Sequence, residues 1–471
     1  MVESNALRPD GAARFGFQYH ERGNGEVDKF FKISERGSTV GTEVIGGLTT
    51  FLAMAYIIAV NPQFMVAAGI PYNAALTATC FGAAIMTVCM GLVANRPLAL
   101  ASGMGVNAIV AFTLASSTGL GVDWRVAMAV VMLEGVVITI LVVCGLRKAI
   151  MDAIPASLRL AIGIGIGLFI AFIGLKGGGI IVTNESNILG AGDLTSGTCI
   201  VAVISILIAI VLTARNVKGA LLISIVAATI IGIPFGVTTL PTQWNFGLDF
   251  SSFAAPFQTD PATGTMAVAQ VFMQPALLLF VFSLLMSDFF DTMGTVVAVG
   301  KQGDFADSEG NVKDIQPILM VDSVAAAVGG FLGSSSLTTF VESSSGAAAG
   351  ARTGLSNLVV AAAFVVFAFL APFVNMVTGA ATCGALVVVG YLMMTAIGEI
   401  DWSRVENAFP AFITVVGIPF TYSITYGIGF GFISYCAIKT FQGKANEVHP
   451  LMWVSAAAFL IMFIFDPSTK H

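Results

Sequence analysis

Five acidic residues stand within long apolar segments of this sequence: Glu134, Asp288, Asp291, Asp322 and Glu342. A charged side chain at the centre of a bilayer costs about 2.5–3.5 kcal/mol on insertion scales, so such residues usually have a function. No Lys, Arg or His stands in the middle of these segments to pair with them. Their expected partners are therefore protons, another cation, helix N-termini or the N–H groups of a solute. We favour protons and leave sodium open.

Two apolar segments, 97–115 and 336–350, are too rich in small and polar residues to be comfortable membrane helices. Short or glycine-interrupted segments at matching places in two halves of a chain indicate a binding site at the membrane midplane. We expect each to be a strand leading into a half-helix, with the strands paired and the half-helix N-termini facing a cavity. The candidate binding residues in these segments are Asn107, Thr339, Phe340, Glu342 and Ser343.

A third candidate region is the end of segment 270–300, which reads SDFFDTMGTVVAVG. Asp288 and Asp291 are three residues apart and so share a helical face. Gly294 has no side chain one turn after Asp291, which leaves room for a flat ligand on the backbone, although a helix-end cap or a structural carboxylate would also explain these residues. Phe290 and Phe340 are candidates for stacking on an aromatic ligand.

Four carboxylates are candidates for carrying a coupled proton: Asp291, Glu342, Asp288 and Asp322. Asp322 has a structural alternative, because it could hydrogen-bond a Ser or Thr on a neighbouring helix. Asn107 also has a structural alternative, because its side chain could form a hydrogen bond between two helices.

The elements that position these residues follow from composition. The chain has 471 residues, of which 56% are hydrophobic and 10% charged, whereas a soluble domain is about 45–50% apolar and about 25% charged. This composition predicts an all-α polytopic membrane protein that needs a lipid bilayer. The six cysteines form no C-x-x-C pair, and the three histidines lie outside the apolar segments. The sequence therefore predicts no metal, no cofactor and no enzyme triad, and the absence of a basic run predicts no nucleic-acid partner.

The apolar segments predict fourteen membrane spans. They cover 43–65, 72–94, 97–115, 124–146, 158–175, 196–214, 219–237, 270–300, 317–333, 336–350, 354–373, 377–398, 409–423 and 425–441. If the polar N-terminal tail, which reads as a cytoplasmic tail rather than a signal peptide, lies inside, most Lys and Arg residues fall on the cytoplasmic side, with Arg125 and Lys176 outside. This asymmetry obeys the positive-inside rule.

Fourteen spans divide into two units of seven, and an odd-numbered unit that is repeated must have inverted topology, as in many secondary transporters. The predicted organisation is a cytoplasmic tail at 1–42, a first repeat at 43–237, an extracytoplasmic connection at 238–269, a second repeat at 270–441 and a C-terminal segment at 442–471. The extra apolar stretch 450–466 is expected to lie in the interface, to pack against the bundle or to cross once more.

The sequence also resembles a known family over about residues 28–466. The matching stretches are FFKISERGSTVGTEVIGGLTTFLAMAYIIAVNP, GMGVNA, SDFFDTMGT, SSSLTTFVESSSGAAAGARTGL, EIDW and PFTYSITYGIGFGFISY, in this order. They resemble the AzgA-like purine permeases, a branch of the nucleobase–cation symporter-2 superfamily.

The resemblance implies fourteen spans in two inverted repeats, a core and a gate domain, and short strands in spans three and ten. It implies transport of adenine, guanine or hypoxanthine, usually with protons, and it is closer to the guanine/hypoxanthine branch. The family's binding carboxylates match Asp291 or Asp288, and Glu342, and its span-three asparagine matches Asn107. Asp291 followed by Gly294 fits the superfamily's Glu-x-x-Gly pattern better than Asp288 does. Homodimers are common in the superfamily, although no residue here identifies an interface.

These observations give one mechanistic hypothesis. A neutral purine enters from outside and lies between the half-helices, where Glu342 accepts hydrogen bonds from ring N–H groups. Asp291 holds another edge of the ring or carries the proton, while Asn107 and the backbone amides after Thr338 complete the polar rim. The core (spans 1–4 and 8–11) then moves against the gate (spans 5–7 and 12–14).

The main alternative is another solute on the same scaffold, such as xanthine, uracil or an anion, with sodium as the coupled ion. An anion transporter would need a positively charged side chain in its site, and the sequence has none in the candidate segments. A channel or a membrane-bound enzyme is the alternative of a different class.

Overall fold

The structure is a computed structural model, and it describes residues 25–116, 120–145, 154–184, 188–241, 246–306 and 312–465. Most of the predicted N-terminal tail (residues 1–24) and the side chain of Phe290 lie outside the described residues. The remaining candidate residues of the site are described.

Eight helical stretches of the described residues are long and apolar enough to cross a membrane. They are Val40–Ala67, Tyr72–Val93, Trp124–Val143, Ala156–Gly177, Gly197–Ala214, Pro275–Gln302, Ile315–Leu332 and Gly379–Glu399. Shorter apolar helices occupy four of the other predicted segments, at Met104–Leu114, Ala220–Gly232, Leu355–Ala368 and Val405–Phe420, and a fifth, Pro450–Ile464, occupies the extra apolar stretch. The prediction of a helical membrane protein is confirmed, while the number of crossings, fourteen, stays a prediction.

One set of helices packs around two short strands, and we call it the first helix group. Its members are α2 (Val40–Met54), α3 (Ile57–Ala67), α4 (Tyr72–Val93), α5 (Met104–Ala108), the π-helix η1 (Ile109–Leu114), α6 (Trp124–Val143), α11 (Ala267–Met273), α12 (Pro275–Gln302), α13 (Ile315–Leu332), α14 (Ser343–Ala348) and α15 (Leu355–Ala368). The pairs α6 with α13 and α4 with α15 are in extensive contact.

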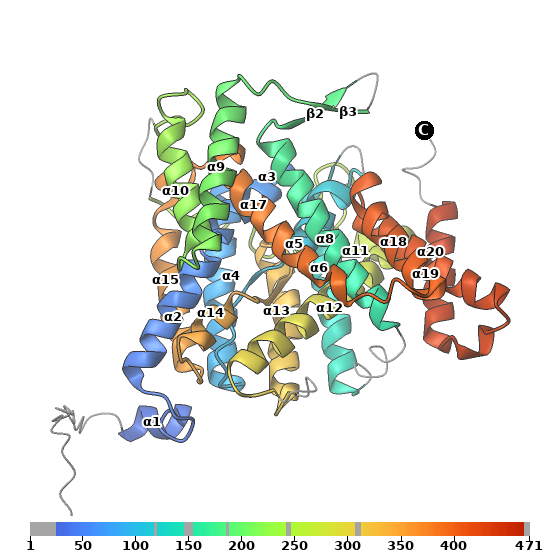
Figure 1. Ribbon diagram of the computed structural model, residues 1–471, viewed down its shortest axis with the longest axis horizontal. Helices are drawn as coiled ribbons and strands as arrows, with labels where there is room; N and C mark the ends of the chain where they lie inside the picture. The colour runs from blue at the N-terminus through green and yellow to red at the C-terminus, as the bar shows by residue number, and fades with distance from the viewer. Residues whose placement is uncertain are drawn as a thin grey trace, which may run out of the picture.

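The second helix group packs around α8 (Ala156–Gly177), which contacts both α17 and α18. Its other members are α9 (Gly197–Ala214), α10 (Ala220–Gly232), α17 (Gly379–Met394), η3 (Thr395–Glu399), α18 (Val405–Phe420) and α19 (Ile424–Phe441). Short elements complete the chain at α1 (Gly25–Phe31), η2 (Ala255–Phe257), α16 (Ala371–Val374) and η4 (Ala445–Glu447). Helix α1 and the β2–β3 hairpin (Ile181–Asn184 and Ile188–Ala191) lie at opposite ends of the helices (Figure 1).

Side-chain caps fix where several helices begin. Thr39 accepts a hydrogen bond from the Thr42 amide at the start of α2, and Ser196 accepts one from the Cys199 amide at the start of α9. Each cap satisfies one of the backbone N–H groups that the first helical turn leaves without a partner.

Glycine allows the closest helix contacts. A Cβ added to Gly135 of α6 would lie 2.0 Å from the backbone nitrogen of Ala327 in α13. One added to Gly390 of α17 would lie 2.4 Å from the carbonyl oxygen of Gly167 in α8. A larger residue at either place would push two backbones apart, so these glycines set the spacing inside each helix group, as expected for helices packing in lipid.

The two predicted strands are present. Strand β1 (Leu100–Ser102) pairs antiparallel with β4 (Leu337–Thr339), with Leu100 opposite Thr339 and Ser102 opposite Leu337. Further backbone bonds extend the pairing at both ends, from the Phe340 amide to the Ala99 carbonyl (2.9 Å) and from the Gly103 amide to the Ser336 carbonyl (2.9 Å). All six strand residues are buried, and the pairing satisfies backbone groups that have no water partner at this depth.

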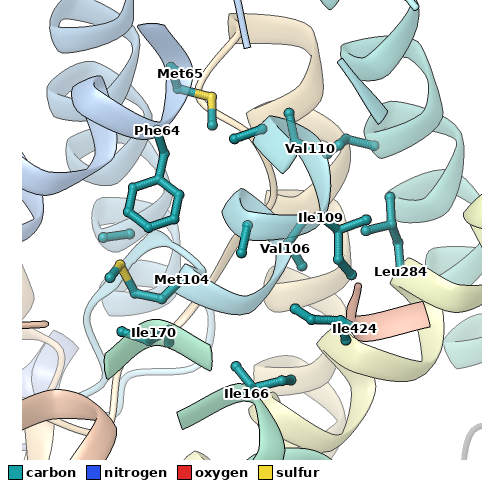
Figure 2. Close-up of a cluster of buried hydrophobic side chains, with 14 of the residues drawn as sticks. Phe64, Met65, Met104, Val106, Ile109, Val110, Ile166, Ile170, Leu284 and Ile424 are labelled. Carbon is teal, nitrogen blue, oxygen red and sulfur yellow. The ribbon is translucent and has the colours of Figure 1, made fainter. Parts of the chain in front are cut away.

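The two helix groups meet around α5 and η1. Figure 2 shows Val106 and Ile109 from this segment in one apolar cluster with Ile166 of α8, Leu284 of α12 and Ile424 of α19. These side chains are buried, so the half-helix after β1 is packed between both groups.

The predicted extracytoplasmic connection is tied to the first helix group. The Ala254 amide donates to the Phe331 carbonyl at the end of α13 (2.8 Å), and the ring of Phe253 packs on Phe331 at 4.9 Å between centroids. Within the connection, hydrogen bonds led by the Gln270 side chain hold the pKa of Asp260 below its usual value. From residue 246 onward, the connection is therefore a folded segment attached to the first helix group.

The extra apolar helix α20 (Pro450–Phe465) packs against α19 and also contacts α12. Phe459 of α20 joins both, since its ring centroid lies 5.6 Å from that of Phe432 in α19 and 5.7 Å from that of Phe282 in α12. Of the three expectations for this stretch, packing against the bundle is the one that the structure shows.

Candidate functional site

The two aspartates of α12 have different surroundings. Asp288 is buried and its Oδ1 accepts a hydrogen bond from Ser336 Oγ (3.4 Å), just before β4. Asp291 and Gly294 are exposed, and a Cβ added to Gly294 would meet nothing within 4 Å. Residues three apart on a helix differ by about 60° in direction, which is enough to turn Asp291 away from the strand that Asp288 faces. Asp291 and Gly294 thus border open space.

Glu342 lies where β4 gives way to α14, and its carboxylate is held by one phenol. The Tyr56 O–H donates to Glu342 Oε1 at 2.7 Å. Glu342 is partly exposed, and its carboxylate also accepts a hydrogen bond from its own backbone N–H. The phenol therefore fixes one carboxylate oxygen of a residue that is itself partly exposed.

Asp291 lies within electrostatic reach of two further carboxylates from different elements. Asp291 of α12 feels the charges of Asp322 of α13 and Glu342 before α14. Helix α12 contacts both α14 and β4, which brings these elements together. Like charges repel more strongly in a low-dielectric interior than in water, so a cation or a proton bound among them would be stabilised.

Asp322 is bonded on both oxygens to threonines and to the outer edge of β4. Its Oδ2 accepts from Thr292 Oγ1 (2.7 Å), and its Oδ1 accepts from the Thr339 amide (3.1 Å) and from Thr338 Oγ1 (3.3 Å). Asp322 is completely buried. The structural alternative for this residue, a hydrogen bond to a neighbouring Ser or Thr, is therefore present.

Thr87 of α4 has the matching position on the outer edge of β1. Its hydroxyl donates to the Leu100 carbonyl (3.0 Å) and accepts from the Leu100 amide (2.9 Å). Each strand of the pair is thus bonded on its free edge by a helix side chain, which removes the unpaired backbone groups that a buried edge would otherwise leave.

Asn107 in α5 is fully buried, and neither its amide nitrogen nor its amide oxygen has a hydrogen-bond partner within the described ranges. The Thr339 hydroxyl oxygen is likewise buried without a hydrogen-bond partner among the described residues. Buried polar groups are almost always hydrogen-bonded, and an exception usually marks a place for water or a ligand. Both residues are therefore suited to contact a polar solute.

Ser343 and Phe340 both have contacts within the protein that do not depend on a ligand. Ser343 Oγ accepts a hydrogen bond from the Ala99 amide (3.0 Å), so it anchors the start of β1. Phe340 is 5% exposed and belongs to the main apolar cluster. Their binding roles stay predictions, and the structure gives each a packing role as well.

The structure brings Glu342, Asp291, Asp322 and Thr339 together, while Asp288 faces Ser336 and Glu134 is buried in α6. Sequence reasoning missed Tyr56. A signal was available, because the hydroxyl of a tyrosine within an apolar segment usually finds a hydrogen-bond partner when buried. Across the described ranges, no group of three His, Cys, Asp or Glu residues could hold a metal ion.

Residues 41–430 match the model of the Permease family. The chain is 38% identical to the adenine permease AdeP of Escherichia coli (strain K12), over 94% of this chain and 97% of that protein. It is 39% identical to the guanine/hypoxanthine permease PbuO of Bacillus subtilis (strain 168), over 92% of this chain and 99% of that protein.

Among solved structures, the fold is similar to that of the transmembrane domain of the cyanobacterial bicarbonate transporter BicA, with a TM-score of 0.60 at 17% identity. That likeness covers 81% of this chain and 96% of the other. The fold is also similar to that of SLC26A9, with a TM-score of 0.62 at 12% identity, covering 89% of this chain and 67% of the other. These likenesses concern the fold alone.

Proposed function

The chain belongs to the Permease family, and its relatives include adenine and guanine/hypoxanthine permeases. From this premise we propose that it imports purine nucleobases together with protons. It is an integral membrane protein and a permease, not an enzyme. Guanine and hypoxanthine are the favoured substrates, and adenine is the third.

The observation that carries the proposal is the pair of carboxylates at Glu342 and Asp291, beside the open space at Gly294. A purine presents ring N–H groups that donate to carboxylates, and its flat ring fits against a backbone without a side chain. The Asn107 amide, buried with no partner in the described part of the chain, offers both a donor and an acceptor to the other edge of the base.

Proton coupling is supported by the charges of the site. Asp291 is repelled by the like charges of Asp322 and Glu342. A proton that enters with the base relieves this repulsion. Sodium would do the same, so the protonophore test below distinguishes the two.

Alternating access is supported by the division into two helix groups. In this proposal the first helix group is the core, the second helix group is the gate, and the tail with α1 faces the cytoplasm. The antiparallel pairing of one strand from each predicted repeat is the arrangement that an inverted relation of the two repeats requires. Thr87 and Asp322, which bond the outer strand edges, come from the second predicted span of each repeat.

The test is uptake of labelled hypoxanthine, guanine and adenine by cells that lack their own purine permeases. We expect accumulation that a protonophore abolishes. The variant Glu342→Gln should lose about tenfold or more of the uptake, because it removes a charged hydrogen bond worth about 1.5–3 kcal/mol. Glu399→Gln, at an exposed glutamate at the end of η3, is the matched control.

Normal accumulation by Glu342→Gln, at an equal amount of protein in the membrane, would remove Glu342 from the site. If uptake continues in the presence of the protonophore but requires external sodium, the coupled ion is sodium rather than a proton. If unlabelled xanthine or uracil inhibits the uptake of labelled hypoxanthine in the same cells more strongly than unlabelled hypoxanthine does, the transported base is a different one.

A further inference from the structure

We infer that Tyr56 is a positioning residue of the substrate site: its phenol O–H fixes one oxygen of the Glu342 carboxylate and so aims the other at the ligand. This inference rests on the proposed function and adds a residue to that site. Tyr56 lies between α2, which ends at Met54, and α3, which begins at Ile57.

Tyr56 cannot easily act by touching the solute itself. Its side chain is 2% exposed, whereas Glu342 is partly exposed. Its hydroxyl donates to Glu342 Oε1 at 2.7 Å, a length typical of a hydrogen bond to an ionised carboxylate. Whatever Tyr56 contributes to binding is therefore transmitted through Glu342.

The backbone around the pair leaves little freedom for this contact to shift. Helix α14 packs directly on α2, where a Cβ added to Gly346 would lie 2.1 Å from Thr50 Oγ1 and 2.5 Å from the Gly46 carbonyl oxygen. The helix that follows Glu342 and the helix that precedes Tyr56 are thus in backbone contact. A donor held this rigidly restricts the rotamers of a flexible glutamate before the ligand arrives, which lowers the ordering cost of binding.

The position also explains why a tyrosine serves here. Asp291 is close enough for its charge to act on the Tyr56 hydroxyl as well as on Glu342. A neutral donor can approach two carboxylates without neutralising either, whereas a lysine or an arginine would form a permanent ion pair. The carboxylates thus stay available to the solute and to the coupled cation.

The test uses the purified full-length protein and two measurements on Tyr56→Phe, which removes the hydroxyl and keeps the ring. The first is the Kd of hypoxanthine by isothermal titration calorimetry, which we expect to rise about tenfold. The second is the carboxyl band in the pH-induced infrared difference spectrum without ligand, identified as the band that Glu342→Gln removes. Tyr56→Phe should shift this band. Tyr391→Phe, at an exposed phenol of α17, is the control for both.

A merely structural role would weaken binding without moving the Glu342 band, and that result would overturn the inference. An unchanged hypoxanthine Kd in Tyr56→Phe would overturn it as well, even with a shifted band. Failure of the proposed function is distinct, because the unaltered protein would then bind no purine while the Glu342 band could still respond to Tyr56→Phe.

Discussion

The two aspartates of α12 are three residues apart and have different surroundings, so we expect them to have different roles. Asp288 is buried against Ser336, and Asp291 is exposed beside Gly294. A carboxylate that is enclosed by its own protein contributes to structure, while one that faces open space has lone pairs left for a solute. The two side chains lie about 60° apart around the helix, and this difference separates a buried position from an exposed one.

We therefore predict different outcomes for the two amide variants. Asp291→Asn should weaken hypoxanthine binding about tenfold or more, because a charged hydrogen bond is lost. Asp288→Asn keeps an acceptor for Ser336, so its binding should change less than that of Asp291→Asn. Hypoxanthine Kd values of both purified variants decide the matter, and the reverse order would move the binding role from Asp291 to Asp288.

At the scale of elements, the strand pair depends on two helices that bond its free edges. Thr87 satisfies both backbone groups of Leu100, and Asp322 satisfies the Thr339 amide. A three-residue strand inside a membrane has no water to bond its outer edge, and an unsatisfied buried group costs about 1–3 kcal/mol. The strands of the site are thus held in place by helix side chains that bond their outer edges.

Thr87→Val tests this support, because valine has the shape of threonine but leaves the amide and carbonyl of Leu100 without their partner. We expect a loss of about 2–6 kcal/mol of stability, read as a lower melting temperature in detergent. Thr139→Val is the matched control, since the Thr139 hydroxyl donates to the Gly135 carbonyl of its own helix and not to a strand. Equal melting temperatures for both variants would show that the strand edge does not need Thr87.

The strands could be predicted from sequence because Gly, Ser and Thr replace the long apolar side chains that a membrane helix needs. Their edge bonds could not, because they join residues far apart in the sequence whose types have many other uses; Thr87 resembles any other helix threonine. Tyr56 lies between these cases. Its burial predicts a partner, but only the contact of α2 with α14 identifies Glu342 as that partner.

For the whole molecule, the two helix groups are joined by a cluster of aromatic rings toward the β2–β3 hairpin. Tyr422, between α18 and α19, packs its ring on Phe112 of η1 at 5.4 Å and on Phe169 of α8 at 5.1 Å, while Phe112 also contacts Phe64 of α3 at 5.6 Å. Lys176, at the end of α8, lies over the Tyr422 ring. If the groups are core and gate, these rings close the path on the hairpin side and must separate to admit a base.

Cross-linking tests that motion. We predict that Phe112→Cys with Tyr422→Cys, joined through disulfides by a short bifunctional methanethiosulfonate reagent, stops hypoxanthine uptake, because the link ties the first helix group to the second. A reductant that cleaves the link should restore the uptake of the same sample. The control pair is Phe253→Cys with Phe331→Cys, whose rings are 4.9 Å apart but belong to segments attached to the same group. Its cross-link should leave uptake intact, since no motion is expected within that group. Unimpaired uptake by the cross-linked Phe112 and Tyr422 variant would show that the groups need not separate here, and another seam would have to open.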